Sequence, residues 1–371
     1  MKMRVFWTVL FLLAVLWSGC GKDGKKTIPS SVAYQLPEDH RLHQGAKYQN
    51  DNDMEWLYFT GKLSDSKGNN YGYEVNIFQV WMDEIQDFAY KTDIAITDVS
   101  NDRFHVSSLF SFASGTLRFD PEKKENLWEY MDEGITIRHW ESSDIWELKT
   151  NNGKSGDAYF GIDLILQNSI QDYYPETPNG VIKMGRCEGG NIENMLGLSY
   201  YYTHPDLKTE GTFEIAERLI SVSGDTWFDH QWGNFNKCPA NWDWFSLRLD
   251  SGDKLMLFQF NERDNPEDPV ESLLALAYFP ADGDPAYRSG KDAFKAIPLR
   301  KYRSKVNGKV FRVDWKLETP YGNYFIRPYI DEQVVPDGND SYYEGLVKVY
   351  RDTEDGPIIG SGYLETTIVG G

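Results

Sequence analysis

The chain of 371 residues is acidic, rich in aromatic residues and poor in cysteine. Its formal net charge of −19 repels nucleic acid and anionic lipid head groups, so neither is expected as a partner. Its length favours two domains of ordinary size.

The N-terminus has the pattern of a bacterial lipoprotein signal peptide in residues 1–19. Lys2 and Arg4 open it, an apolar run follows at 5–17, and small residues directly precede Cys20. We therefore expect cleavage before Cys20 and its lipidation, which would take the net charge from −19 to −21 as two cations are lost. An ordinary secretory signal with an incidental cysteine is the alternative.

Residues 20–30 are polar and without periodicity, as in a flexible tether. The resulting expectation is a lipid-anchored protein of the cell envelope, in the outer membrane, with no further segment apolar enough to cross a bilayer. The remaining cysteines are Cys187 and Cys238. A disulfide between them and two separate buried thiols are equally compatible with an exported chain.

From residue 31 onwards, short aromatic and β-branched runs alternate with turn residues. Residues 56–60 and 71–78 flank the turn-forming segment 66–70, which predicts a strand, a turn and a strand. The same pattern predicts strands at 94–98, 134–140, 146–150, 160–167, 198–202, 211–215, 219–224, 243–249, 254–260, 309–317, 323–328, 345–350 and 360–367. Helical spacing is limited to the short segments 104–112 and 288–294. The sequence thus predicts an all-β fold of antiparallel barrels or sandwiches.

No standard catalytic signature occurs in the sequence. His40 and His43 have the spacing of metal ligands, but they lie in a polar segment without an obvious third ligand. We therefore interpret them as a solvated pair and predict neither a metal ion nor a cofactor.

The most unusual segment is 224–235, in which Asp229 precedes His230 among aromatic residues. Burial and a carboxylate shift the pKa of an imidazole in opposite directions, and such a pair can serve acid–base chemistry. On the strand that follows, Trp242 and Trp244 share one face. Two interpretations stay open: an aromatic core with a structural Asp–His pair, or a ligand pocket lined by Trp and Tyr.

Several segments together resemble the AttH-like and carotenoid 1,2-hydratase (hydroxyneurosporene synthase) family. They occur in the family's order at 55–61, 199–203, 227–232, 242–245, 342–345 and 362–366. The resemblance implies two consecutive lipocalin-like β-barrels, which we place at residues 31–212 and 213–371. Family members include hydratases that add water to a terminal isoprenoid double bond and relatives linked to cyclisation.

The resemblance also implies site residues for an apolar small molecule or lipid. The expected catalytic groups are His230 backed by Asp229, and Glu365, which could point into a barrel and stay protonated. The expected ligand-binding residues are Trp56, Tyr58, Tyr201, Trp227, Trp232, Trp242, Trp244 and Glu344.

Two positions depart from the family pattern. Gln231 stands where the family commonly has Glu, and 258–260 reads Phe-Gln-Phe where the carotenoid branch has Tyr-x-Asp. An enzyme that hydrates, isomerises or cyclises an apolar molecule by acid–base chemistry is one hypothesis. A non-catalytic carrier of a hydrophobic ligand is the second, and a protein-interaction domain is the third.

Overall fold

The computed structural model describes most of the chain beyond the N-terminal segment. The described residues are 34–36, 38–43, 54–82, 85–112, 116–120, 127–132, 134–155, 158–167, 173–183, 198–234, 241–262, 265, 268–337 and 341–370. The predicted signal peptide and tether, Cys20, Cys187 and Cys238 lie outside these residues.

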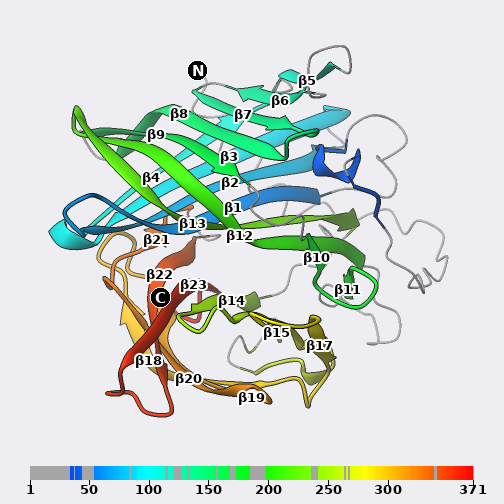
Figure 1. The fold of residues 1–371 in the computed structure, drawn as a ribbon, viewed down its shortest axis with the longest axis vertical. Helices are drawn as coiled ribbons and strands as arrows, with labels where there is room; N and C mark the ends of the chain where they lie inside the picture. The colour runs from blue at the N-terminus through cyan, green and yellow to red at the C-terminus, as the bar shows by residue number, and fades with distance from the viewer. Residues whose placement is uncertain are drawn as a thin grey trace.

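The first half of the chain forms one curled antiparallel sheet of 13 strands. The strands are β1 (Met54–Ser64), β2 (Asn70–Met82), β3 (Asp87–Asp98), β4 (Arg103–Ser111), β5 (Thr116–Asp120), β6 (Leu127–Asp132), β7 (Ile135–Trp140), β8 (Ile145–Ser155), β9 (Ala158–Gln167), β10 (Tyr174–Pro175), β11 (Val181–Lys183), β12 (Leu198–Ile215) and β13 (Arg218–Asn234). Their order is β4-β3-β2-β1-β13-β12-β9-β8-β7-β6-β5, with β10 and β11 paired to β12. Because β4 packs against β8, the sheet closes into a barrel-like shell (Figure 1).

The second half forms a curled antiparallel sheet of 10 strands. The strands are β14 (Asn241–Leu249), β15 (Lys254–Asn261), β16 (Ala275–Phe279), β17 (Ala286–Ser289), β18 (Lys295–Arg303), β19 (Val310–Thr319), β20 (Gly322–Pro328), β21 (Val334–Val335), β22 (Tyr342–Arg351) and β23 (Ile358–Thr367). Their order is β17-β16-β15-β14-β23-β22-β20-β19-β18, and β21 pairs with β22. The predicted all-β fold of two antiparallel, barrel-like units is confirmed.

The boundary between the two units differs from the one expected after residue 212. The chain changes sheets between Asn234 and Asn241, and residue 212 lies inside β12. The boundary needs correction because β12 and β13 form one long hairpin, whose second arm returns to pair with β1. The hairpin turns tightly at Ala216 and Glu217, both with positive φ. In the sequence alone, such a turn cannot be distinguished from a linker between domains.

The two segments with helical spacing are not helices. Residues 104–111 belong to β4, which pairs with β3, and 288–294 contains the end of β17 and a turn. Cross-strand pairing overrides a weak local periodicity of this length. Within the described ranges, the helical elements are the 3-10 turns η1 (Glu38–His40), η2 (Val99–Asn101) and η4 (Glu271–Leu273). None of the helices described is long or apolar enough to span a membrane.

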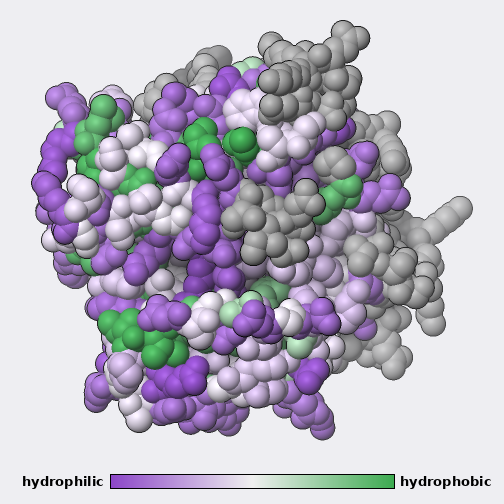
Figure 2. All heavy atoms as spheres, in the orientation of Figure 1, coloured by the Kyte–Doolittle hydropathy of each residue, from purple (hydrophilic) through white to green (hydrophobic). Residues whose placement is uncertain are grey.

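Strand alternation divides the buried side chains into three groups. Residues such as Phe59 and Trp146 fill the first barrel, and Phe245 and Trp315 fill the second. A third cluster, including Trp227 and Trp244, lies where the outer faces of the two sheets pack together. The face of the molecule seen in Figure 2 is mainly hydrophilic with scattered apolar groups. Many of the aromatic side chains are buried, among them Trp128, Trp146, Trp227 and Trp315.

Candidate functional site

The pairing of β1 with β13 decides where the predicted site residues point. Leu57 faces His230 and Tyr58 faces Asp229 across the two strands. Because successive side chains of a strand point to opposite faces, His230 lies inside the first barrel while Asp229 lies between the two sheets. The expected support of His230 by Asp229 is therefore replaced by different partners for each residue.

Inside the first barrel, His230 belongs to a buried hydrogen-bonded group that we call the histidine network: Asp39, His40, His43, Glu55, Tyr202 and His230. His230 Nε2 lies 2.7 Å from Glu55 Oε1, and its Nδ1 lies 3.0 Å from the Tyr202 hydroxyl. His43 Nδ1 contacts the same Glu55 oxygen at 2.7 Å. Both ring nitrogens of His230 are thus occupied by protein groups.

The network contains a buried imidazolium–carboxylate pair. Burial alone lowers the pKa of His43, but the charge of Glu55 and the bonds to Asp39 and Glu55 outweigh it and raise that pKa to about 10. Burial alone raises the pKa of Glu55, but His43 and the bond from His230 lower it to about 2. For His230, burial dominates and lowers its pKa below the ordinary value. At neutral pH the pair is charged and His230 is neutral.

The predicted solvated pair, His40 and His43, is in fact buried, with only 3% and 6% of each residue exposed. The 3-10 turn η1 and the residues after it insert both rings into the barrel, where His43 stacks on Trp232 at 4.7 Å. The local sequence does not predict this burial, because the partners of the two histidines, such as Glu55 and Tyr202, come from distant strands.

Two groups in this barrel have donor atoms of the kinds that bind a metal ion. In His40–His139–Asp144 and in His43–Glu55–His230, these atoms lie within 4.8 Å of one another. Both groups contain acid–histidine contacts at hydrogen-bond distance, 2.9 Å for His139 to Asp144. Ligation would require loss of the shared protons, so we describe both as hydrogen-bonded clusters.

The other predicted residues meet between the sheets, at what we call the interface site: Tyr58, Tyr201, Trp227 and Asp229 of the first sheet and Trp242, Trp244, Glu344 and Glu365 of the second. Asp229 accepts hydrogen bonds from the Tyr201 hydroxyl at 2.6 Å and from Trp227 Nε1 at 2.7 Å. Trp244 Nε1 donates across the interface to the Tyr201 hydroxyl at 3.1 Å. An aromatic donor shell therefore surrounds the Asp229 carboxyl.

The two glutamates of the second sheet are held in the same manner. The Tyr58 hydroxyl donates to Glu344 across the interface at 2.6 Å, and Trp242 Nε1 donates to Glu365 at 3.0 Å. We expected Glu365 to point into a barrel, and it does not. Its neighbours Leu364 and Thr366 occupy the barrel interior. Alternation places it on the outer face, towards the first sheet.

Burial raises the pKa values of these carboxyl groups to neutrality or above it. It raises the pKa of Asp229 to about 7, against the bonds from Thr203, Tyr201 and Trp227. It raises the pKa of Glu365 to about 7 as well. The pKa of Glu344 lies well above its usual range because of burial and then the nearby charge of Glu74.

Sequence reasoning missed a second polar group in the interface. The Tyr342 hydroxyl lies 3.0 Å from Glu74 and 2.8 Å from Asp93, and Lys91 pairs with Asp93 at 3.0 Å. Alternation would have assigned Glu74 to the outer face of β2. In the first sheet alone that face would be exposed to solvent. It is buried because the second sheet covers it.

The interface site is closed in this structure. Tyr58, Tyr201, Trp227 and Trp244 are each less than 5% exposed, whereas Trp242 is only partly buried. A cavity between the sheets measures about 20 Å³, which suits one or two water molecules. A larger ligand needs the aromatic side chains or the sheets to move apart.

Two curled antiparallel sheets that pack outer face to outer face define a two-barrel, lipocalin-like β protein. The chain belongs to the AttH-like family, whose family model matches residues 27–368. The family assignment made from sequence motifs is thereby confirmed. A comparison with curated proteins finds no match.

Solved structures share this fold. A putative AttH protein from Nitrosomonas europaea is 24% identical, with a TM-score of 0.74 over 92% of this chain and 99% of that one. Kievitone hydratase from Nectria haematococca is 15% identical, with a TM-score of 0.65 over 92% and 96%. CghA is 10% identical, with a TM-score of 0.51 over 86% and 89%. At these identities the likeness is one of fold.

Proposed function

We propose that the interface site binds an apolar small molecule and converts it by proton transfer from a buried carboxylic acid. The observation that carries this proposal is the placement of three buried carboxyls with raised pKa values, those of Asp229, Glu344 and Glu365, among Tyr and Trp side chains. A carboxyl group that stays neutral in an apolar site can donate a proton as a general acid.

The chemistry follows from this placement. Glu344 or Glu365 gives its proton to one carbon of a substrate double bond, and the positive charge on the other carbon faces the Trp227 and Trp244 rings. Water then adds to that carbon and returns a proton to the carboxylate, which gives net hydration. Loss of a different proton to the carboxylate gives an isomer instead.

The fold of kievitone hydratase supports hydration, as its name states that activity for that protein. We assign proton transfer to the interface acids and a structural role to His230, because both nitrogens of His230 are bound inside the first barrel. The missing acid at 258–260 is then supplied by Glu344 and Glu365 from other strands.

A non-catalytic carrier is the second candidate, favoured by the neutral Gln231 and the closed interface. We further propose that the protein works at the cell envelope, anchored through Cys20. A Cys20→Ser variant that stays in the membrane fraction would contradict the anchor.

Mass spectrometry in heavy-oxygen water tests the proposed function. The mature protein without Cys20 is incubated with an apolar extract of its source cells, alongside the Glu344→Gln and Glu365→Gln variants. We expect one apolar species to reappear with one heavy water, or isomerised at equal mass, and at least one variant to lose this conversion about a hundredfold or more. The control Glu318→Gln, at an exposed carboxylate, keeps it. Retention of one species without conversion would favour the carrier, and unchanged turnover in both variants would contradict the assignment.

A further inference from the structure

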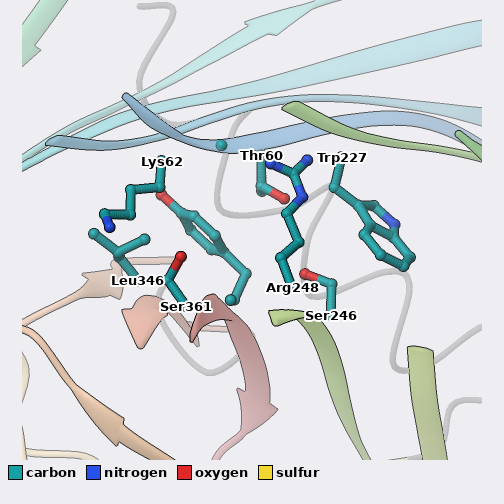
Figure 3. Close-up of a pocket in the computed structure, with 10 residues that line it drawn as sticks. Thr60, Lys62, Trp227, Ser246, Arg248, Leu346 and Ser361 are labelled. Carbon is teal, nitrogen blue, oxygen red and sulfur yellow. The ribbon is translucent and has the colours of Figure 1, made fainter. Parts of the chain in front are cut away.

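The cavity of about 20 Å³ between the sheets has a basic side chain in its wall. Figure 3 shows Arg248 extending from the second sheet towards Thr60 of the first, with Trp227 beside it. Ser246 and Ser361 add hydroxyl groups to the lining. The lining also includes Lys62 and Tyr363, so two basic side chains and four hydroxyl-bearing side chains surround one small space.

Two polar atoms in this wall have no protein partner. Thr60 Oγ1 and Arg248 Nη2 are buried and form no hydrogen bond with any residue that the structure describes. Thr60 itself is 1% exposed. A buried donor without a partner costs free energy, and a charged one costs more. Such atoms mark a place that a polar group from outside the chain can occupy.

The nearby carboxylates do not fill this role. Burial lowers the pKa of Arg248, and the charges of Asp225 and Asp206 act in the opposite direction. Asp225 is bound by Lys208 at 2.6 Å, and Asp206 by Lys208 at 3.2 Å and by Lys254 at 3.4 Å. Arg248 therefore has acidic neighbours at a distance but no ion-pair partner in contact among the residues that the structure describes.

We infer that this cavity binds the carboxylate of an apolar acid, with Arg248 as its counter-ion. Guanidinium donors match the two oxygens of a carboxylate, and the Thr60 hydroxyl adds a third donor. The cavity must widen to admit the apolar part of the ligand, which then lies against Trp227, Leu346 and Tyr363 of the same lining.

This inference rests on the proposed function only in placing the ligand between the sheets. It adds a substrate class, namely a hydrophobic molecule with a terminal carboxylate. The acid group would fix the ligand at Arg248, so that its apolar chain extends into the aromatic cluster that also contains Tyr58 and Trp244.

Calorimetric titration with three probes tests the site: dodecanoate below its micelle concentration, 1-dodecanol, and acetate. We expect dodecanoate to bind the wild-type protein more tightly than either other probe. Arg248→Gln should weaken dodecanoate binding on the order of tenfold to a hundredfold, while Arg103→Gln, at an exposed arginine, leaves it unchanged. If Arg248→Gln fails to fold, Thr60→Val removes the hydroxyl donor and should weaken binding by a smaller factor.

Three results would overturn the inference: equal binding of dodecanol and dodecanoate, equal binding of acetate and dodecanoate, or no measurable binding of dodecanoate to the wild type. The Glu344→Gln variant separates this inference from the proposed function. If it binds dodecanoate normally and the wild type shows no conversion of any species, the carboxylate site stands and the proposed acid chemistry is wrong. If dodecanoate does not bind while conversion depends on Glu344, the carboxylate site is wrong and the proposed acid chemistry stands.

Discussion

At the residue scale, Glu55 determines the electrostatics of the first barrel. Its carboxylate is 1% exposed and accepts hydrogen bonds from two histidines, of which His43 carries the charge. A buried ion pair of this kind adds little over an apolar pair of the same size, but removing one partner leaves an uncompensated charge.

The Glu55→Gln substitution should therefore destabilise the protein by about 3 kcal/mol, since it leaves the buried His43 imidazolium with the partly exposed Asp39, at 2.9 Å, as its remaining carboxylate partner. The free energy of unfolding in urea measures the effect. Asp163→Asn, which breaks the exposed pair with Lys149, is the matched control and should cost about 1 kcal/mol or less. Equal effects from both substitutions would contradict the charged-pair description.

Part of the candidate site was predictable at this scale. The motifs identified Tyr58, Asp229, Glu344 and Glu365 as site residues, and all four lie in the interface. Adjacency in sequence suggested that Asp229 supports His230, although alternation on a strand places them on opposite faces. The true partners, Glu55 and Tyr202 for His230, lie far along the chain and could not be derived from spacing.

At the element scale, the sheets approach closely at Gly72 on the outer face of β2. A Cβ atom there would lie 2.5 Å from the Tyr363 hydroxyl and 2.9 Å from Leu346 Cβ, both of the second sheet. Glycine is required at this point because any side chain would push the sheets apart.

Gly72→Ala should accordingly lower the free energy of unfolding by about 1–3 kcal/mol. Chemical denaturation measures the change, and the open position Gly370, where an added Cβ meets only an atom at 3.9 Å, provides the control Gly370→Ala. A neutral result at Gly72 would mean that the sheets adjust freely, against the closed interface described here.

The strands were largely predictable from their runs of aromatic and β-branched residues, but their grouping was not. The turn at Ala216 joins two strands of one sheet, and the chain leaves that sheet only after Asn234. Turn chemistry is the same at a hairpin and at a domain boundary, so only the pairing of β13 with β1 distinguishes them.

At the scale of the whole molecule, the acid-lined interface makes stability depend on pH in an unusual direction. The folded protein raises the pKa of Asp229 from 3.8 and that of Glu365 from 4.5, both to about 7. At these two groups the folded state binds more protons than the unfolded state, so their contribution to the free energy of unfolding falls as pH rises from about 4 to about 7. His43, raised from 6.5 to about 10, continues the fall above pH 6.5.

Below pH 4.5, Glu55 gives the pH dependence of stability the opposite sign. Glu55, lowered from 4.5 to about 2, loses its contribution as pH falls below 4.5. The buried histidines with lowered pKa values, His230 among them, act in the opposite direction below pH 6.5, so a variant that lacks the two interface carboxyls is needed to isolate their contribution. In thermal unfolding at a series of pH values, the double variant Asp229→Asn, Glu365→Gln should show a more positive slope of stability against pH between pH 4.5 and 7 than the wild type. An unchanged slope would contradict the raised pKa values.

The central claim is that the apolar interface holds carboxyl groups in their protonated form at neutral pH. Infrared spectroscopy tests it most directly, because the C=O stretch of a protonated carboxyl is distinct from the bands of a carboxylate. We predict a protonated-carboxyl band in the wild-type protein at pH 7 that diminishes in Glu344→Gln and persists in Glu318→Gln. A spectrum at pH 7 without that band, or one that Glu344→Gln leaves unchanged, would contradict the account.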